Sequence, residues 1–335
     1  MSNVSLPRAA LILCTLLLAA FPLIGTTFYV QLGAKIMLMA IFAMSLDLLV
    51  GHTGLVSLGH AAYFGVAAYA LALISPKYEA ASVWLSLPAA VAASALTALV
   101  IGFLVVRTAG IYFIMVTLAF AQMLYSVFHD TGLGGGSDGI YIYVRPELSV
   151  AGLKPVDLEN PVHFYYLVLV LMLGVYALLS RVLRAPFGRA LAGIKANETR
   201  MRSIGYPVFA YKLGAFVLGG ALAGLAGYLA ACQFGFVNPE ILAWHHSGTV
   251  LMMVILGGMG KLHGAVLGAF AYVLLQELLS APAVFGAYAK HWQLPMGSFI
   301  VLMVLALPHG LAGLLDRRGF RLHRRTSESA DEETE

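Results

Sequence analysis

Long apolar runs separated by short polar segments recur along nearly the whole chain. A helix needs about 20 mostly apolar residues to cross the ~30 Å hydrocarbon layer of a membrane. Eight stretches of that length carry no Asp, Glu, Lys or Arg, and two further apolar segments carry one carboxylate each, Asp47 and Glu277. The pattern therefore predicts an all-α polytopic membrane protein with about ten transmembrane helices, near residues 9–25, 34–50, 60–75, 85–106, 111–128, 162–181, 208–231, 246–259, 265–281 and 294–310.

The overall composition agrees with a membrane protein and excludes most other classes. Only 11% of the 335 residues are charged and 60% are hydrophobic. A soluble protein has about 25% charged residues and at most about half apolar residues. So little polar surface excludes soluble enzymes, nucleic-acid-binding domains and disordered chains. The net charge of +4 does not indicate a nucleic-acid partner, because membrane topology decides where the basic residues lie.

The sequence offers no cofactor or metal chemistry. Cys14 and Cys232 both lie in apolar runs, so we expect neither a disulfide framework nor a cysteine-based metal site. The segment GGMGKLH at 257–263 approaches an ATP-binding P-loop, but it lacks the first glycine and the final Ser or Thr of that motif. GGGSDG at 134–139 has the spacing of a dinucleotide-binding loop without the strand–helix unit around it. We therefore expect no cofactor, no metal and no catalytic residue.

Basic residues indicate which ends of the helices face the cytoplasm, because short cytoplasmic loops carry an excess of Lys and Arg. Seven of the 20 basic residues lie between Arg181 and Lys212, and five more follow from Arg317 onward. Four predicted spans separate these two clusters and six spans precede the first, so both clusters can be cytoplasmic. This topology places both termini in the cytoplasm, with 15 basic residues inside and 5 outside.

The same topology divides the chain into one membrane domain and short polar segments. We expect a transmembrane domain over residues 1–315, a cytoplasmic segment at 185–207, an outer loop at about 129–161 and a polar cytoplasmic tail at 316–335. The first apolar run follows Arg8 and could instead be a signal peptide, but nine further spans favour a retained helix. No polar segment is long enough for a separate soluble domain.

Few ionisable residues lie within the apolar runs. Asp47, Glu277 and His60 stand near predicted helix ends, where they either line a polar substrate path or are interfacial or internally hydrogen-bonded. So few such groups argue against a proton relay and favour energy supplied by a partner. The glycine-rich run 51–59 predicts a broken helix or a re-entrant turn. The polar residues that we expect near a substrate path are Asp47, Thr53, Ser57, His60, Thr117 and Gln122.

Two glycine pairs predict close packing between helices. Gly220 with Gly224, and Gly264 with Gly268, have the spacing GxxxG. That spacing lets two helices approach closely within a membrane, where a smooth surface of small residues favours association. A hinge for a gate is the alternative interpretation of the same glycines.

The segment APFGRALAGIKANETRMRSIGYP at 185–207 is too polar to enter the membrane and has the pattern of an amphipathic helix. Pro186 suits a first helical turn, and Gly205 followed by Pro207 predicts the end of the helix. Such a helix can lie on the membrane surface or enter a groove on another protein. Its apolar stripe consists of Phe187, Leu191, Ile194, Met201 and Ile204.

Three blocks of the sequence carry a family resemblance. They are GHTGLVSLGHAAYFGVAAYA at 51–70, GIYFIMVTLAFAQMLY at 110–125, and PFGRALAGIKANETRMRSIGY at 186–206. The third block continues into YKLGAFVLGGALAGLAGYLAA and SGTVLMMVILGGMGKLHGAVLGA. Together they resemble the permease subunits of branched-chain amino acid ABC importers, in particular the LivM type. The similarity runs from about residue 36 to 313, and the spacing of the blocks is specific to the family.

The resemblance implies that this chain forms the membrane path of an ATP-driven importer for branched-chain, hydrophobic amino acids. The 186–206 helix would be the coupling helix that sits in a cleft of the ATP-hydrolysing subunit, and the chain itself would not be an enzyme. Lys195 and Ala192 stand where residues vary in such proteins, so no role is carried over to them. By motif match, the coupling residues are Phe187, Gly188, Arg189, Leu191, Ile194, Glu198 and Gly205.

The implied partners are a second, related permease in a heterodimer, two ATPase subunits and a solute-binding protein outside a bacterial inner membrane. The same family includes urea and short-amide permeases, so urea is a rival substrate. A gradient-driven carrier or channel is the alternative from another class. It would be active as this chain alone, with Asp47 or Glu277 essential for activity.

Overall fold

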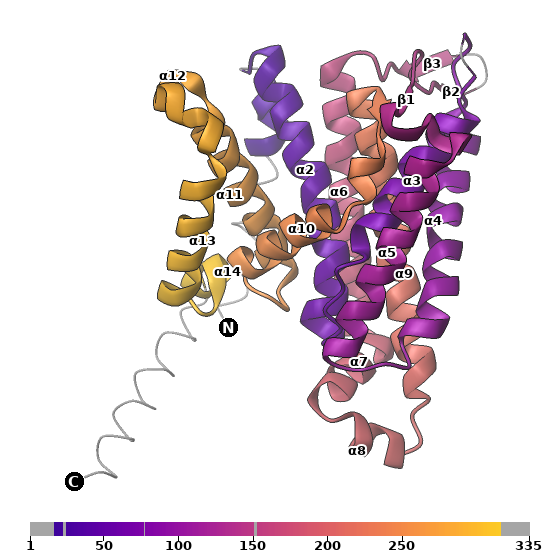
Figure 1. Ribbon diagram of the computed structural model, residues 1–335, viewed down its shortest axis with the longest axis vertical. Coiled ribbons are helices and arrows are strands. Elements are labelled where there is room, and N and C mark those ends of the chain that lie inside the picture. The colour runs from indigo at the N-terminus through magenta and orange to yellow at the C-terminus, as the bar shows by residue number, and fades with distance from the viewer. Residues whose placement is uncertain (1–16, 23–24, 77, 151–152, 316–335) are drawn as a thin grey trace, which may run out of the picture.

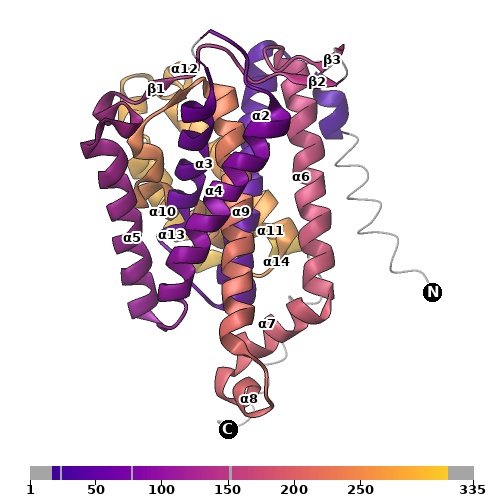
Figure 2. The ribbon, with the colours of Figure 1, turned by 90° about the vertical axis from the view of Figure 1, so that its right-hand side faces the viewer.

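A computed structural model of the chain describes residues 17–22, 25–76, 78–150 and 153–315, which are mostly helical. Figures 1 and 2 show a main bundle, a second group of helices that leans against α2, and two short helices, α7 and α8, at one end. The main bundle contains α2 (Thr27–Asp47), α3 (His60–Ile74), α4 (Val83–Val105), α5 (Ile111–Asp130), α6 (Pro161–Arg184) and α9 (Val208–Phe234). The other helices are α7 (Pro186–Ala196), α8 (Glu198–Ser203), α10 (Trp244–Gly257), α11 (Leu262–Ser280), α12 (Pro282–Phe285), α13 (Gln293–Ala306) and α14 (Gly310–Leu315).

The helix lengths confirm an all-helical, multi-pass membrane protein. Within the described part of the chain, seven helical segments are long and apolar enough to cross a membrane, and each corresponds to a predicted span. Two further predicted spans form shorter helices, α3 with 15 residues and α10 with 14. At 1.5 Å per residue these helices are only ~22 Å long, less than the ~30 Å hydrocarbon layer. The first predicted span, 9–25, lies mainly outside the described residues, although 17–22 are helical.

Short strands form at the end of the bundle opposite α7 and α8 (Figure 1). Three of them lie within the segment predicted as an outer loop, and the fourth directly follows α9. β1 (Ile140–Tyr141) pairs antiparallel with β4 (Phe236–Val237), with Ile140 opposite Val237. β2 (Leu148–Val150) pairs antiparallel with β3 (Leu153–Val156). The sequence did not predict these strands, because two to four residues are too few to show an alternating pattern. They fold the loop back onto the bundle.

The centre of the molecule is formed by α2 and α9. Every residue of α2 from 36 to 47 is buried, and α2 contacts α6, α9, α10 and α11. A helix surrounded on all sides has no polar face. This explains why the apolar run of α2 shows no helical stripe. The helix α9 is the second central helix, because α3 and α4 both pack along it.

Small residues allow these helices to approach closely, as the glycine spacing predicted. A Cβ atom on Gly224 would lie 2.5 Å from the Cβ atom of Ser94 on α4, and one on Gly220 would overlap Ala98. Ser94 adds polar contacts, because its hydroxyl lies 2.8 Å from the Gly220 carbonyl oxygen and 2.9 Å from that of Tyr63. On α11, a Cβ on Gly268 would overlap the Met253 carbonyl of α10. The structure thus confirms tight packing for both glycine pairs.

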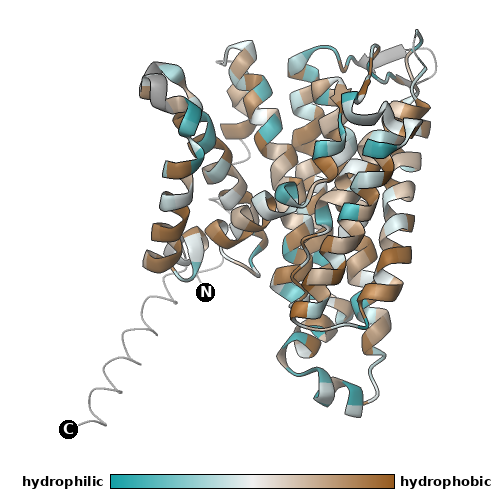
Figure 3. Cartoon of the chain, viewed as in Figure 1, coloured by the Kyte–Doolittle hydropathy of each residue, from teal (hydrophilic) through white to brown (hydrophobic). Residues whose placement is uncertain are grey.

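The outer faces of the helices are apolar. Val100 on α4, Met115 on α5 and Leu302 on α13 are each more than half exposed. In a membrane protein such faces contact lipid or another subunit. Figure 3 shows hydrophobic residues along the helices and hydrophilic residues on α7 and α8 and at the opposite end.

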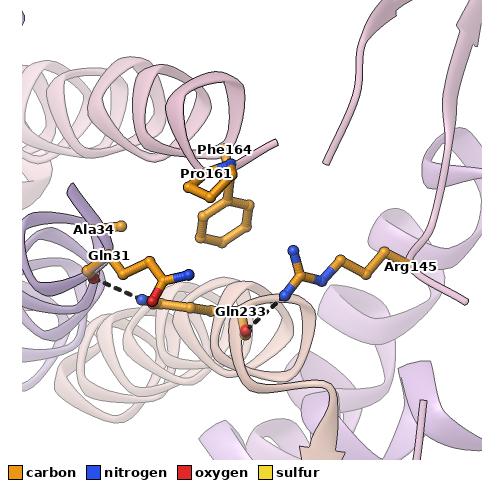
Figure 4. A pocket seen from close by; sticks show the side chains of 6 residues that line it. All are labelled: Gln31, Ala34, Arg145, Pro161, Phe164 and Gln233. Atoms are coloured by element: carbon orange, nitrogen blue, oxygen red, sulfur yellow. Dashed lines mark hydrogen bonds between the residues drawn. The ribbon is translucent and has the colours of Figure 1, made fainter. Parts of the chain in front are cut away.

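The loop end is tied to the bundle through Arg145. Its guanidinium donates hydrogen bonds to the carbonyl oxygens of Leu158 at 3.0 Å, Glu159 at 3.3 Å and Gln233 at 3.2 Å. Gln233, in the last turn of α9, in turn donates to the Gln31 carbonyl of α2 at 2.7 Å. Figure 4 shows these side chains around a pocket of about 10 Å³, which has room for about one water molecule.

We expect the Arg145→Ala variant to loosen the loop without unfolding the bundle. Hydrogen bonds to a charged group contribute about 1.5–3 kcal/mol, so amide hydrogen exchange over residues 131–160 should accelerate by at least about tenfold. Exchange in α2 and α9 should stay unchanged. The Arg145→Lys variant keeps the charge but loses the forked geometry of the guanidinium. Its loop exchange rate should lie between those of the wild type and Arg145→Ala. Unchanged loop exchange in Arg145→Ala would contradict this role.

Candidate functional site

The helix α7 turns back under the bundle directly after α6. Pro186 occupies its first turn, where a missing N–H group costs nothing. Gly188 packs so closely on the backbone of Leu183 that any side chain there would overlap it. Leu191 and Ile194 are buried, and Phe187 stacks on Tyr211 of α9 with ring centroids 5.5 Å apart. The apolar side of α7 therefore faces its own bundle.

The helix α8 is separate from α7, which differs from the single helix predicted for this segment. Asn197 has an extended backbone and ends α7, and its side chain caps α8 by accepting a hydrogen bond from the Arg200 amide at 2.9 Å. Asn is a favourable N-cap for this reason. Gly205 ends α8 with φ of 92°, and the Tyr206 amide donates to the Met201 carbonyl at 3.1 Å. The predicted end of the segment is thus confirmed.

An ion-pair network anchors α8 to α9. Glu198 pairs with Arg202 at 2.7 Å and with Lys212 at 2.5 Å, and the Lys212 side chain is almost fully buried. Burial of the Glu198 carboxyl would raise its pKa, but the hydrogen bond and charge of Lys212, together with Arg202, outweigh this and lower the pKa below its ordinary value. Glu198 is therefore a charged tether between the two helices.

The seven residues carried over by resemblance thus fall into two groups. Gly188, Leu191 and Ile194 are buried within this chain, with Phe187 and Glu198 partly buried, whereas Arg189 and Gly205 are exposed. The apolar stripe predicted to enter a groove or lie on the membrane packs on this chain instead, except that Ile204 is 65% exposed. The reason is that α7 follows α6 through a tight turn and has the bundle end beside it. The surface available to a partner is the opposite face of α7 and most of α8.

The end of α2 is broken, as the glycine-rich run 51–59 predicted. The last turn, Leu48–Thr53, is a π-helix, and Gly54 follows with φ of 75° in the left-handed region. A Cβ on Gly51 would lie 2.5 Å from the Gly260 amide nitrogen and would overlap Asp47, so only glycine fits there. Single π turns often mark functional positions in helices. The chain then runs back without helical structure to His60, where α3 begins.

Asp47 lies at this break and is fully buried. Its Oδ1 atom accepts a hydrogen bond from the Gly260 amide at 2.8 Å, and its Oδ2 atom lies 3.8 Å from Nε2 of His52. Among the described residues, Oδ2 has no hydrogen-bond partner. The carboxyl group therefore joins α2 to the connection between α10 and α11. Thr53 is buried in the same turn and donates to the Leu49 carbonyl at 2.5 Å.

The start of α3 forms a second polar site inside the bundle. His60 is fully buried, and its Nε2 lies 2.9 Å from the Ser45 hydroxyl of α2. Because the Ser45 hydroxyl donates to the Phe42 carbonyl at 2.7 Å, it must accept from His60, which places the imidazole proton on Nε2. The Ala61 amide donates to Ser247 of α10 at 2.8 Å. Ser45 lies two residues before the end of α2, within the candidate membrane span Thr27–Thr53.

Two more of the predicted path residues adjoin this site. The Thr117 hydroxyl of α5 accepts a hydrogen bond from the Leu58 amide at 3.3 Å, and a Cβ on Gly59 would overlap the Thr117 carbonyl. Ser57 is fully buried and accepts from the Gly59 amide at 3.2 Å. The structure thus brings Ser57, His60 and Thr117 together. Asp47 and Thr53 lie apart from them at the π turn, and Gln122 lies on the exposed face of α5.

The comparisons with known proteins decide the family. The model of the family described as the branched-chain amino acid transport system permease component matches residues 28–307, most of the chain. The chain belongs to this permease family.

Individual relatives agree with this assignment. The chain is 31% identical to the high-affinity branched-chain amino acid transport system permease protein LivM of Escherichia coli K12, over 90% of this chain and 74% of that protein. It is 23% identical to the probable branched-chain amino acid transport permease protein LivH of Methanocaldococcus jannaschii, over 83% and 89% of the two chains. It is also 32% identical to the autoinducer 2 import system permease protein LsrC of Klebsiella pneumoniae, over 45% and 44%. No solved structure matches the chain.

Sequence reasoning missed three residues that make hydrogen bonds at these sites. Lys195 donates from Nζ to the Gly51 carbonyl at 2.5 Å and so joins α7 to the π turn, whereas Ser45 and Ser247 hold the start of α3. Lys195 and Gly51 are 144 positions apart, so no local pattern points to their contact. Within the described residues, no group of three His, Cys, Asp or Glu side chains could hold a metal ion. The role of the permease family is transport, not catalysis.

Proposed function

We propose that this permease forms the membrane path of an ATP-driven importer for branched-chain amino acids, and that α7 and α8 receive the movement of an ATPase subunit. The observation that carries this proposal is the two-sided character of α7. One side is fixed to the bundle through Leu191 and Ile194, and the other presents Arg189 to the exterior. A helix held in this way can pass a push from a partner into the bundle, as two-state gating requires.

The proposed assembly contains a second, related permease, two ATPase subunits and a solute-binding protein. The α7–α8 end carries the cluster of basic residues between Arg181 and Lys212, so it faces the cytoplasm. With this orientation both termini are cytoplasmic in a bacterial inner membrane. The segment 129–161 then faces outward, where the solute-binding protein would dock, and the polar tail 316–335, outside the described residues, is cytoplasmic.

The substrate path in this proposal runs beside the start of α3. Ser57, His60 and Thr117 supply neutral hydrogen-bonding groups at membrane depth, which suits a zwitterionic amino acid. Asp47 and Thr53 would line its cytoplasmic end. Gln122 is exposed on α5, where a second permease could cover it to complete the path.

Purification of the tagged chain from its native membranes in mild detergent tests this function. We expect an ATPase subunit and a second permease to be recovered with it. After reconstitution with the solute-binding protein, the complex should import leucine, isoleucine or valine only when ATP is supplied on the α7–α8 side. ATPase variants that cannot hydrolyse ATP are the matched control.

Other outcomes distinguish the rival functions. ATP-dependent uptake of urea instead of leucine would support the assignment as an ATP-driven importer but would contradict the proposed amino acid substrate. Recovery of this chain alone, with uptake in liposomes that lack ATP, would favour a gradient-driven carrier.

A further inference from the structure

The π turn leaves the Gly51 carbonyl without the amide partner that a regular helix would supply. In a regular helix the Gly51 carbonyl would accept a hydrogen bond from the amide of Leu55. Here the Leu55 amide donates to the Leu49 carbonyl at 3.0 Å, and the Gly54 amide also donates to Leu49. The Gly51 carbonyl therefore loses its regular backbone donor and is open to a side-chain donor.

Lys195 supplies that donor from the neighbouring helix α7. Its Nζ atom lies 2.5 Å from the Gly51 carbonyl oxygen, and its Cγ atom lies 3.4 Å from the position of a Cβ on Gly54. The absence of side chains at Gly51 and Gly54 gives the lysine stem room to reach the backbone. A charge-assisted hydrogen bond of this kind is about twice as strong as a neutral one.

The other side of the π turn contacts the connection between α10 and α11. Asp47 accepts from the Gly260 amide at 2.8 Å, and the missing side chain of Gly51 lets the backbone of Gly260 approach. Gly258, two residues earlier, lies against Gly310 at the start of α14, where a Cβ on Gly310 would be 2.5 Å from the Gly258 amide nitrogen. The π turn thus stands between α7 and the second group of helices.

We infer that Lys195 is a positioning residue for transport, which passes the movement of α7 through the π turn and Asp47 to the connection between α10 and α11. This inference rests on the proposed function, in which an ATPase moves α7. The contacts form one continuous series: Lys195 holds Gly51, Gly51 packs on Gly260, and Asp47 holds Gly260. The π turn is the element that changes, because a turn with one extra residue can rearrange without breaking the rest of α2.

The same contacts provide a route by which a shift at the cytoplasmic end can reach the starts of α3 and α10. α10 begins with Trp244 and supplies Ser247, which holds the Ala61 amide of α3. A rigid helix moved at its Gly257 end also moves at its Trp244 end. Pulling Gly51 through Lys195 therefore displaces α10 and alters the polar site at His60.

The test uses the purified, reconstituted importer and measures two rates, ATP hydrolysis and substrate uptake. The Lys195→Met variant keeps the apolar stem and loses the donor, whereas Lys195→Arg keeps a donor. We expect Lys195→Met to hydrolyse ATP but to import less substrate per ATP. Because Lys195 is exposed overall, the expected loss is about threefold, below the roughly tenfold of a shielded hydrogen bond to a charged group. Lys195→Arg should restore most of the ratio. Arg181→Met, an exposed basic residue in the last turn of α6, is the matched control and should be unchanged.

The second arm tests the far end of the series. Asp47→Leu removes the acceptor for the Gly260 amide and should lower the same ratio, whereas Asp47→Asn keeps an acceptor oxygen and should retain most of it. The double variant Asp47→Leu with Lys195→Met should be no worse than the more affected single variant, since both act through one link. An unchanged ratio in Lys195→Met, or uptake and hydrolysis falling in parallel, would overturn the inference and leave Lys195 as a structural contact. If Lys195→Met does not assemble, Lys195→Gln with one weaker donor replaces it. A wild-type complex without ATP-dependent uptake would instead refute the proposed function.

Discussion

The Gly227→Ala variant is expected to lose much of its folded stability. A Cβ atom at this position of α9 would overlap the carbonyl group of Phe64 on α3, and it would lie 3.0 Å from the Phe64 Cα atom. Backbone atoms in the middle of a packed helix cannot move aside as a side chain can, so α3 and α9 must separate. Overpacking of a core typically costs about 1–3 kcal/mol, and we expect the upper end of this range because the obstructing atoms belong to the backbone. The separation would also disturb His60 at the start of α3.

Thermal unfolding in detergent measures this effect, with the reaction of the buried Cys232 with a thiol-reactive dye as the signal. Cys14 is first replaced by Ser, so that Cys232 is the one thiol left to react with the dye. The matched control is Gly174→Ala in α6, where a Cβ meets nothing within 4 Å. That variant should be as stable as the parent or up to about 1 kcal/mol more stable, because alanine favours a helix over glycine. Equal stability of the two variants would contradict the close contact of α3 and α9.

The Glu198→Ala variant is expected to detach α8 from the bundle. Removing this carboxylate leaves the buried ammonium of Lys212 without its ion-pair partner. Breaking a buried pair costs about 3–5 kcal/mol, but Glu198 is about a third exposed, so we expect about 2 kcal/mol. Amide exchange in α8 should therefore accelerate by roughly thirtyfold. The double variant Glu198→Ala with Lys212→Met should recover part of the loss, because no charge is then left buried.

Arg202→Ala is the control for this prediction, because Arg202 pairs with the same carboxylate but its side chain is 71% exposed. An exposed pair contributes at most about 1 kcal/mol. If Arg202→Ala and Glu198→Ala loosen α8 equally, the buried pair is not the tether.

The tether should also depend on pH. The pKa of Glu198 in the folded protein lies below its ordinary value of 4.5. The carboxylate therefore stabilises the contact above pH 4.5, and this stabilisation is lost as the pH falls from 4.5 through the lowered pKa. Exchange in α8, corrected for intrinsic rates, should rise over that range in the wild type and not in Glu198→Gln. A rise of the same size in both proteins would assign the pH dependence to another group.

The coupling segment illustrates how far sequence reasoning reaches. Its place, its helical character and its end at Gly205 follow from local features: polarity, apolar spacing and a glycine before a proline. The break at Asn197 does not follow, since an Asn within a helical pattern is as compatible with a continuous helix as with a cap. Which side of α7 is buried could not be predicted either. An amphipathic stripe shows that one face needs an apolar partner but not whether the partner is the same chain.

The polar residues show the same division. Asp47 and His60 stood out because ionisable residues are rare in apolar runs, and the break between them was visible in the glycines of 51–59. Ser45 and Ser247 gave no signal, because serine is common and its hydroxyl often bonds to the preceding turn of its own helix. Their contacts with His60 and Ala61 depend on how α2, α3 and α10 cross.

The sequence by itself determined that this chain is a helical membrane protein, where most spans lie, and where an amphipathic segment interrupts them; the permease family followed from the resemblance of three motif blocks, not from the spans. The physical reason is that crossing a membrane imposes a local requirement, about 20 apolar residues in a row, which any window of the chain reveals. Only the tertiary structure decided that Lys195 holds Gly51 and that Asp47 holds Gly260, 213 positions away. Such contacts arise from close packing at glycines between distant helices, and no periodicity along the chain encodes which helices meet.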